Sequence, residues 1–145
     1  PNNPTGNAFP AREIEELLRR FDGDWFDVLD KVAHGRLAEA ELVWSDDPAV
    51  SVVLASGGYP GDYEKGFEIR GLEEAAATGA VVFHAGTAFK DGKIVNAGGR
   101  VLGVSARGET IAEAIDKAYQ AVDKISFKGG FCRRDIGAKA LKYSK

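Results

Sequence analysis

The sequence contains no methionine, one cysteine and two histidines among its 145 residues. Cys132 has no second cysteine with which to form a disulfide inside the chain, and together with His34 and His84 it shows no metal-ligand spacing. No apolar run approaches the roughly 18 residues of a membrane span, and the N-terminus lacks a signal-peptide pattern. We therefore expect a cytoplasmic protein without a metal site. Because the chain begins at Pro1 without an initiator methionine, we also expect a piece of something longer.

Two nucleotide-binding motifs are missing as well. No glycine loop ends in Gly-Lys-Ser/Thr, and no G-x-G-x-x-G joins a strand to a helix, so a nucleotide fold of its own is not expected. The net charge of -3 gives no general attraction to nucleic acid or to an anionic membrane. Hydrophobic residues at 44% and charged residues at 28% are near the globular average, and the length suits one domain with a proper core.

The first third of the chain has a helical period and then changes to a strand period. Apolar spacing predicts amphipathic helices over residues 11–21 and 24–34, the second followed by Gly35. Branched residues then predict strands over 41–44 and 50–54, and we expect these to form a hairpin around the Asp-Asp-Pro turn between them.

The remaining residues predict a mixed fold of short strands and helices. We expect a short helix over 72–77, a buried strand over 80–84, and a hairpin of 87–89 with 93–95 across Asp91-Gly92. We also expect a strand over 99–106 and a helix over 110–125, which begins at Thr110 or Glu109. The last helix should pack across the sheet, and the basic end from 127 to 145 has room for one more helical turn. No repeat and no linker divides residues 40–145, and the class is α+β.

Four short clusters place backbone freedom beside polar side chains, as a loop that approaches a ligand requires. They are Ser56 to Gly61, His84 to Thr87, Gly98 to Leu102, and Arg133 to Ile136. In the first cluster, the amides of Gly57 and Gly58 are suited to face an anion or a carboxylate. The alternative is a tight turn in which Pro60 fixes one torsion and Gly61 takes the positive φ.

The other polar residues also allow two interpretations each. His84 suits a proton donor or an anion contact, or else a satisfied, half-buried histidine. Cys132 has a charged neighbour that would lower its pKa, although a packed thiol is the simpler interpretation. Arg133 and Arg134 suit phosphate or carboxylate, while an internal pair with Asp135 is at least as common. The arginines are the stronger candidates for binding.

With Tyr63 to Gly66 added, these four clusters become five. In their order and spacing the five clusters are similar to the C-terminal domain of the glycinamide ribonucleotide synthetase family, over about residues 26–141. The resemblance implies a small hybrid of antiparallel strands with helices packed outside, the C-terminal type of ATP-grasp ligases, preceded here by two N-terminal helices. It divides the chain into an N-terminal helical segment, residues 1–38, and the family-like domain, residues 39–145. Members join glycine to phosphoribosylamine in purine synthesis, using ATP and magnesium or manganese.

The same resemblance defines what this chain lacks. The ATP-grasp core that holds nucleotide and metal lies upstream in the family, so the chain alone should be inactive and should hold no cofactor. Its expected partners are the missing N-terminal and ATP-grasp domains, with glycine and phosphoribosylamine as substrates, and its role is to close one side of the active site. The candidate substrate-binding residues are Gly57, Gly58, Tyr59, Pro60, Arg100 and Arg133. No residue is assigned a catalytic step.

Residues 1–20 carry a second resemblance, to the Asn-Asn-Pro-Thr-Gly segment of pyridoxal-phosphate aminotransferases, in which Asn3 corresponds to the cofactor-ring contact. The cofactor lysine and the phosphate cup of that family have no room here, and the motif is also simply a good turn before a helix. Two families that meet near residue 22 suggest a chimera, a fusion or a recombined segment. A noncatalytic binding module and an engineered or recombined scaffold without activity are therefore alternatives to the ligase fragment.

Overall fold

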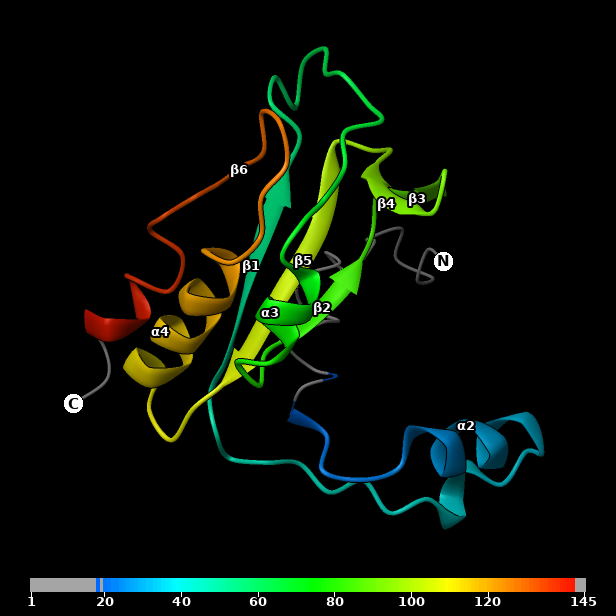
Figure 1. The fold of residues 1–145 in the computed structure, drawn as a ribbon. Coiled ribbons are helices and arrows are strands. Elements are labelled where there is room, and N and C mark those ends of the chain that lie inside the picture. The colour runs from blue at the N-terminus through cyan, green and yellow to red at the C-terminus, as the bar shows by residue number, and fades with distance from the viewer. Residues whose placement is uncertain (1–17, 19, 143–145) are drawn as a thin grey trace.

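The computed structural model describes residues 18 and 20–142 (Figure 1). The helices in this part are α2 (Trp25–Ala33), α3 (Leu72–Ala76) and α4 (Ile111–Val122), with short 3-10 turns η1 (Leu37–Glu39) and η2 (Ala140–Lys142). The strands are β1 (Ala49–Ala55), β2 (Val81–His84), β3 (Thr87–Lys90), β4 (Lys93–Asn96), β5 (Arg100–Arg107) and β6 (Phe131–Cys132). The α+β class with antiparallel sheets and packed helices is thus confirmed.

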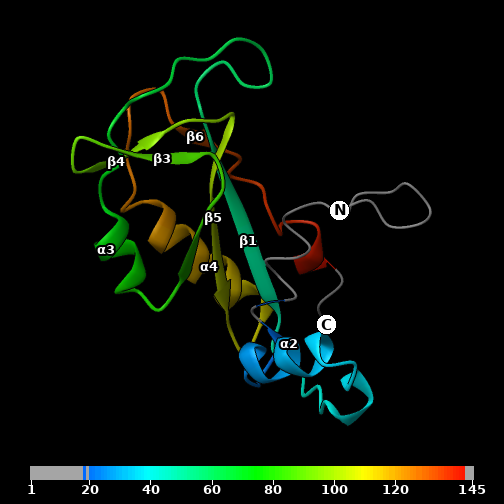
Figure 2. The same ribbon diagram turned by 90° about the vertical axis from the view of Figure 1, so that its right-hand side faces the viewer.

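An antiparallel sheet in the order β2-β5-β1-β6 is the centre of the molecule. Strands β1 and β5 pair along most of their length, with Val52 opposite Val104 and Leu54 opposite Leu102. Helices α3 and α4 lie on the same side of this sheet (Figure 2). Because side chains alternate along a strand, every second residue of β1 and β5 faces these helices and the others face away from them.

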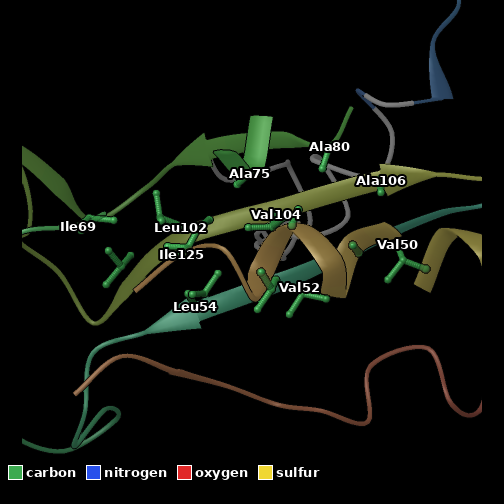
Figure 3. Packing of buried hydrophobic residues seen from close by; sticks show 14 of the residues in the cluster. Val50, Val52, Leu54, Ile69, Ala75, Ala80, Leu102, Val104, Ala106 and Ile125 are labelled. Atoms are coloured by element: carbon green, nitrogen blue, oxygen red, sulfur yellow. The ribbon is translucent and has the colours of Figure 1, made fainter. Parts of the chain in front are cut away.

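The core lies between the sheet and α4 (Figure 3). Val52, Leu102 and Val104 are fully buried on the strands. Helix α4 faces them with small residues, since Ala114 and Ala118 are also fully buried and let the helix approach the sheet closely. The expected helix over 110–125 is confirmed as α4, which packs across the sheet and ends at Val122.

The hairpin expected between residues 41–44 and 50–54 is wrong. Strand β1 pairs with β5 and β6 instead, and Trp44 forms an isolated bridge with Phe21. The physical reason is aromatic packing, because Trp44 lies 5.5 Å from Phe21 and 6.4 Å from Trp25 between ring centroids. The segment before β1 therefore has a small cluster of its own, while β1 obtains its partners from distant parts of the chain.

Several local predictions are confirmed. The helix expected over 24–34 is α2, whose first turn is capped by the Asp24 carboxylate accepting from Phe26 N at 2.7 Å. The hairpin across Asp91-Gly92 is β3 with β4, and both turn residues have positive φ, 50° and 78°. The helix expected over 72–77 is α3. The helix expected over 11–21 and the aminotransferase-like motif lie almost entirely outside the described residues.

No helix in the described ranges is long and apolar enough to cross a membrane. Within the same residues, the carboxylate, imidazole and thiol side chains form no group of three or more that could hold a metal ion.

Candidate functional site

A hollow of about 340 Å³ opens on the sheet face that points away from α4. We call it the sheet pocket; its lining consists of Ser51, Val53, Ala55, Tyr59, Arg100, Phe131, Cys132, Arg133 and Ile136. The residues from β1 are the ones that alternate with its core residues, which places the sheet pocket opposite the helices. The volume is in the range of small-molecule sites. The structure thus brings Tyr59, Arg100 and Arg133 together from three distant segments.

A β-bulge sets the direction of Arg100. Leu54 pairs with Leu102, yet the next residue, Ala55, pairs with Arg100, so one extra residue stands in β5 at this point. Without the bulge, Val101 would stand opposite Ala55. Because of the bulge, the arginine faces the pocket while Val101 stays in the core, fully buried. Arg100 has no side-chain hydrogen bond or ion pair within the part of the chain that the structure describes, and its guanidinium is available to an anion.

The ring of Tyr59 lies directly on the backbone of Gly99. A β-carbon at Gly99 would overlap the Cδ2 and Cε2 atoms of the ring, although the φ of Gly99 is not positive. The absence of a side chain at Gly99 is therefore required by the ring. Tyr63 also contacts the Tyr59 ring, in an edge arrangement with ring centroids 6.3 Å apart. These contacts hold Tyr59 at the edge of the sheet pocket.

A buried amide anchors the loop that carries Tyr59. Asn96 is 1% exposed, and its Nδ2 donates to the Ser56 hydroxyl at 2.9 Å and to the Glu64 carbonyl at 2.8 Å. Its Oδ1 accepts from Phe67 N at 2.7 Å. The Ser56 hydroxyl in turn donates to the Gly98 carbonyl at 2.8 Å. Both ends of the loop from 56 to 67 are thus tied to the same side chain.

The two arginines after Cys132 are already paired. Arg133 donates from Nε and Nη2 to the two Asp135 oxygens at 2.9 and 2.6 Å, which raises the pKa of Arg133 and lowers that of Asp135. Arg134 pairs with Asp123 at 2.6 Å. The internal Arg-Asp pair that the sequence allowed is therefore present. The pairing partly neutralises Arg133 and leaves Arg100 as the less committed cation.

The glycine loop contributes to the pocket through Tyr59. Gly57, Gly58 and Pro60 do not line the sheet pocket. A β-carbon on Gly57 would lie 2.6 Å from the Gly129 carbonyl oxygen, so this glycine permits a close approach of two backbones. The positive φ of the turn, 97°, belongs to Gly58 and not to Gly61 as the turn alternative expected. The backbone packing of the loop explains these glycines without a ligand.

His84 and Cys132 have structural surroundings. His84 is exposed, not half-buried, and its Nδ1 lies 3.0 Å from the Thr87 hydroxyl. Burial raises the pKa of the Cys132 thiol against the opposing effect of Arg134, which fits a packed thiol. Cys132 nevertheless lines the sheet pocket together with Phe131 and with Val53 from β1. No sequence pattern marked these apolar wall residues, because only the pairing of β6 with β1 brings them to the site.

A second hollow of about 460 Å³ lies beside the sheet pocket and shares Arg133 and Ile136 with it. It is larger and contains Lys139, but the Asp135 carboxylate lines it as well, and neither Tyr59 nor Arg100 reaches it. The sheet pocket is therefore the better candidate for binding an anion.

An antiparallel sheet with helices on one face and an arginine-bearing pocket on the other defines a small α+β domain. Comparison with known proteins supplies its family. Residues 49–139 match the family described as "Phosphoribosylglycinamide synthetase, C domain", and the chain belongs to this family. The resemblance that the sequence motifs indicated is confirmed.

Relatives named phosphoribosylamine–glycine ligase cover most of the chain. The protein from Caldanaerobacter subterraneus subsp. tengcongensis is 48% identical over 90% of this chain and 31% of its own length. The chloroplastic protein of Arabidopsis thaliana is 49% identical over 92% of this chain and 26% of its own. A trifunctional purine biosynthetic protein of Gallus gallus is 45% identical over 93% of this chain and 14% of its own. The chain thus spans a third or less of these relatives' length.

A solved structure agrees in fold. The crystal structure of phosphoribosylamine–glycine ligase from Thermotoga maritima superimposes with a TM-score of 0.62 at 44% identity, covering 74% of this chain and 26% of that one. The sequence alignments cover nine-tenths of this chain or more, so they extend beyond residues 49–139 into the N-terminal segment. The likeness of residues 1–20 to aminotransferases stays a prediction.

Proposed function

We propose that this chain is the part of an ATP-dependent ligase that closes one side of the active site where glycine is joined to 5-phosphoribosylamine. The observation that carries the proposal is the convergence of Tyr59, Arg100 and Arg133 on one pocket in a domain of this family. The relatives that bear the name of this ligase support it. Residues 39–145 would form the domain, and the cytoplasm is the compartment we expect, although the plant relative is named chloroplastic.

Arg100 would supply the charge that recognises the phosphate of phosphoribosylamine. It faces the pocket and has no competing carboxylate among the described residues, whereas Arg133 shares its charge with Asp135. Tyr59 and Phe131 would enclose the sugar between aromatic and apolar surfaces. This chain would thus bind and orient substrate and exclude water, and none of its residues is given a proton-transfer step.

ATP and magnesium or manganese would be bound by the remainder of the ligase. The described residues offer no cluster of three metal ligands, and the sequence has no phosphate-binding motif of its own. The nucleotide would supply the energy that activates the glycine carboxylate. The isolated chain would therefore bind a ribose phosphate without turning it over, which also covers the alternative of a noncatalytic binding module.

A covalent hybrid tests this function. Residues 49–145 would replace the aligned C domain of the Caldanaerobacter ligase, so that the host supplies everything upstream. We expect glycine- and phosphoribosylamine-dependent ADP release from the hybrid and none from the host that lacks the C domain. Arg100→Gln in the hybrid should raise the KM for phosphoribosylamine more than the KM for glycine.

A folded hybrid that binds ATP but releases no more ADP than the truncated host would overturn the proposal. A hybrid in which Arg100→Gln leaves the phosphoribosylamine KM unchanged would remove Arg100 from the site.

A further inference from the structure

One side of helix α2 exposes three large apolar side chains in a row. Phe26, Leu29 and Val32 are 77%, 61% and 49% exposed, and their spacing of three residues places them along the same side of the helix. We call this stripe the Phe26 face. The other apolar residues on this side of the helix are packed, because Val28 is buried and Trp25 lies 4.4 Å from Phe21 between ring centroids. A single exposed apolar residue is ordinary, but a contiguous stripe on a helix of nine residues indicates a contact surface.

The polar side of the same helix has its partners. Asp27 and Lys31 form an ion pair at 2.7 Å, and Asp30 lies within 3.4 Å of Arg36 and 3.3 Å of His34. These pairs all lie inside the segment, so its charged groups need no further partner to be satisfied. The Phe26 face is the surface of α2 that the described residues leave uncovered.

The segment that follows α2 also exposes apolar side chains. Leu37, Leu42 and Val43 are 53%, 46% and 48% exposed, and they follow α2 directly in the chain. Figure 1 shows α2 at the periphery, away from the sheet and from α4. The Phe26 face is therefore distant from the core that stabilises residues 49–139.

We propose that the Phe26 face packs against the part of the ligase that this chain lacks, so that α2 is an interface between domains. The inference rests on the proposed function. The length of the relatives indicates which partner covers the Phe26 face. This chain spans 31% of the Caldanaerobacter ligase, and the alignment extends into the segment that carries α2. An apolar stripe without unpaired charges suits the centre of a permanent interface between parts of one enzyme.

The test mixes two separately produced pieces. The whole chain of 145 residues is titrated with the remainder of the Caldanaerobacter ligase, and the Kd is measured by calorimetry. We expect association, and we expect the double change Phe26→Asp and Leu29→Asp to raise the Kd by about tenfold or more. The matched control on the polar side of α2, Asp27→Asn, should leave the Kd within about twofold.

Two further measurements separate this interface from the pocket. The double variant should keep its circular dichroism spectrum and its affinity for ribose 5-phosphate, and Phe26→Leu should associate as the unchanged chain does. If the double variant bound the remainder of the ligase with the same Kd as the unchanged chain, the proposal that the Phe26 face is an interface would be overturned. Absence of association between the unchanged pieces would overturn it as well, even where the covalent hybrid is active, and an inactive hybrid with intact association would instead count against the proposed function. A dimer of the chain alone that the double change dissolves would assign the face to a second copy and overturn the proposal.

Discussion

The ring of Tyr59 occupies the space that a side chain on Gly99 would need. Gly99 precedes Arg100, and its carbonyl accepts from Ser56 N at 2.8 Å, so the aromatic edge and the cation of the sheet pocket are joined at one point of the backbone. Because the φ of Gly99 is open to any residue, the requirement for glycine here is steric.

Gly99→Ala should displace the Tyr59 ring and destabilise the chain by about 1–3 kcal/mol, the usual range for overpacking. In a Tyr59→Ala background the same change should cost far less, since the obstructing ring is gone. Urea denaturation of the four proteins in this cycle measures the coupling. Gly61→Ala, in the same loop and without a positive φ, is the control: its β-carbon would lie 3.2 Å from the Gly58 carbonyl oxygen and away from the Tyr59 ring, so its cost should be smaller than that of Gly99→Ala and independent of Tyr59. Additive effects of Gly99→Ala and Tyr59→Ala would contradict the contact.

Arg100→Gln should weaken binding of ribose 5-phosphate by about tenfold, the worth of a charged hydrogen bond in a partly enclosed site. Arg133→Gln should weaken it less, because Asp135 already holds that guanidinium. Asp135→Asn should tighten binding, since it removes the competing negative charge. Calorimetry at two salt concentrations measures all three, and the affinity should fall as salt rises. A larger effect at Arg133 than at Arg100 would reverse the assigned roles.

Asn96→Ala should lower the free energy of unfolding by about 2 kcal/mol or more, because it leaves buried groups at both ends of the loop without partners. Asn96→Asp keeps the shape but loses the amide donors, so it should be destabilising at neutral pH too. Gln120→Ala on the exposed side of α4 is the surface control. If Asn96→Asp were as stable as the unchanged chain, packing and not hydrogen bonding would hold the loop.

Thr110→Ala should destabilise α4 by about 1 kcal/mol, because the hydroxyl accepts from Glu113 N at 3.2 Å as the helix cap. Thr110→Ser keeps this oxygen and should retain most of the stability. Thermal unfolding followed by circular dichroism compares the three proteins, and equal melting temperatures for all of them would show that the cap contributes nothing.

The carboxylate of Glu113 should make part of the stability pH-dependent. Hydrogen bonds from Lys117 and from Glu109 N lower the pKa of Glu113 below its ordinary value of 4.5. Since the folded pKa is the lower one, this stabilisation is present above about pH 4.5 and is lost as the pH falls through the folded pKa. The difference in melting temperature between the unchanged chain and Glu113→Gln should therefore be larger at pH 7 than at pH 3. A difference independent of pH would exclude the carboxylate as its source.

Local patterns predicted the elements whose partners are close in sequence. The apolar periods of residues 24–34 and 110–125 and the Asp91-Gly92 turn each carry their own signal, and each element is present. The prediction of a hairpin between residues 41–44 and 50–54 was wrong because branched residues indicate a strand but do not indicate which strand it pairs with. In the structure Trp44 packs in an aromatic cluster, and β1 pairs with β5, which lies some fifty residues further along the chain.

Some features of the candidate site could be predicted from the sequence, and others could not. Tyr59, Arg100 and Arg133 were identifiable as residue types beside glycines, and the pocket contains all three. The pair of Arg133 with Asp135 was one of the two interpretations that the sequence allowed. The bulge that directs Arg100 and the wall formed by Val53 and Phe131 had no sequence signal. Each of these depends on strand register, which is set by the packing of whole strands.

The order of the motifs by itself determined the family and the residue types that a phosphate-bearing substrate would meet. Only the tertiary structure decided which of them share a cavity, which arginine keeps its charge free and which face of α2 stays bare. The physical reason is that turns and helix caps are fixed by neighbours in the chain, whereas sheet register and burial are fixed by contacts between residues that the chain keeps far apart.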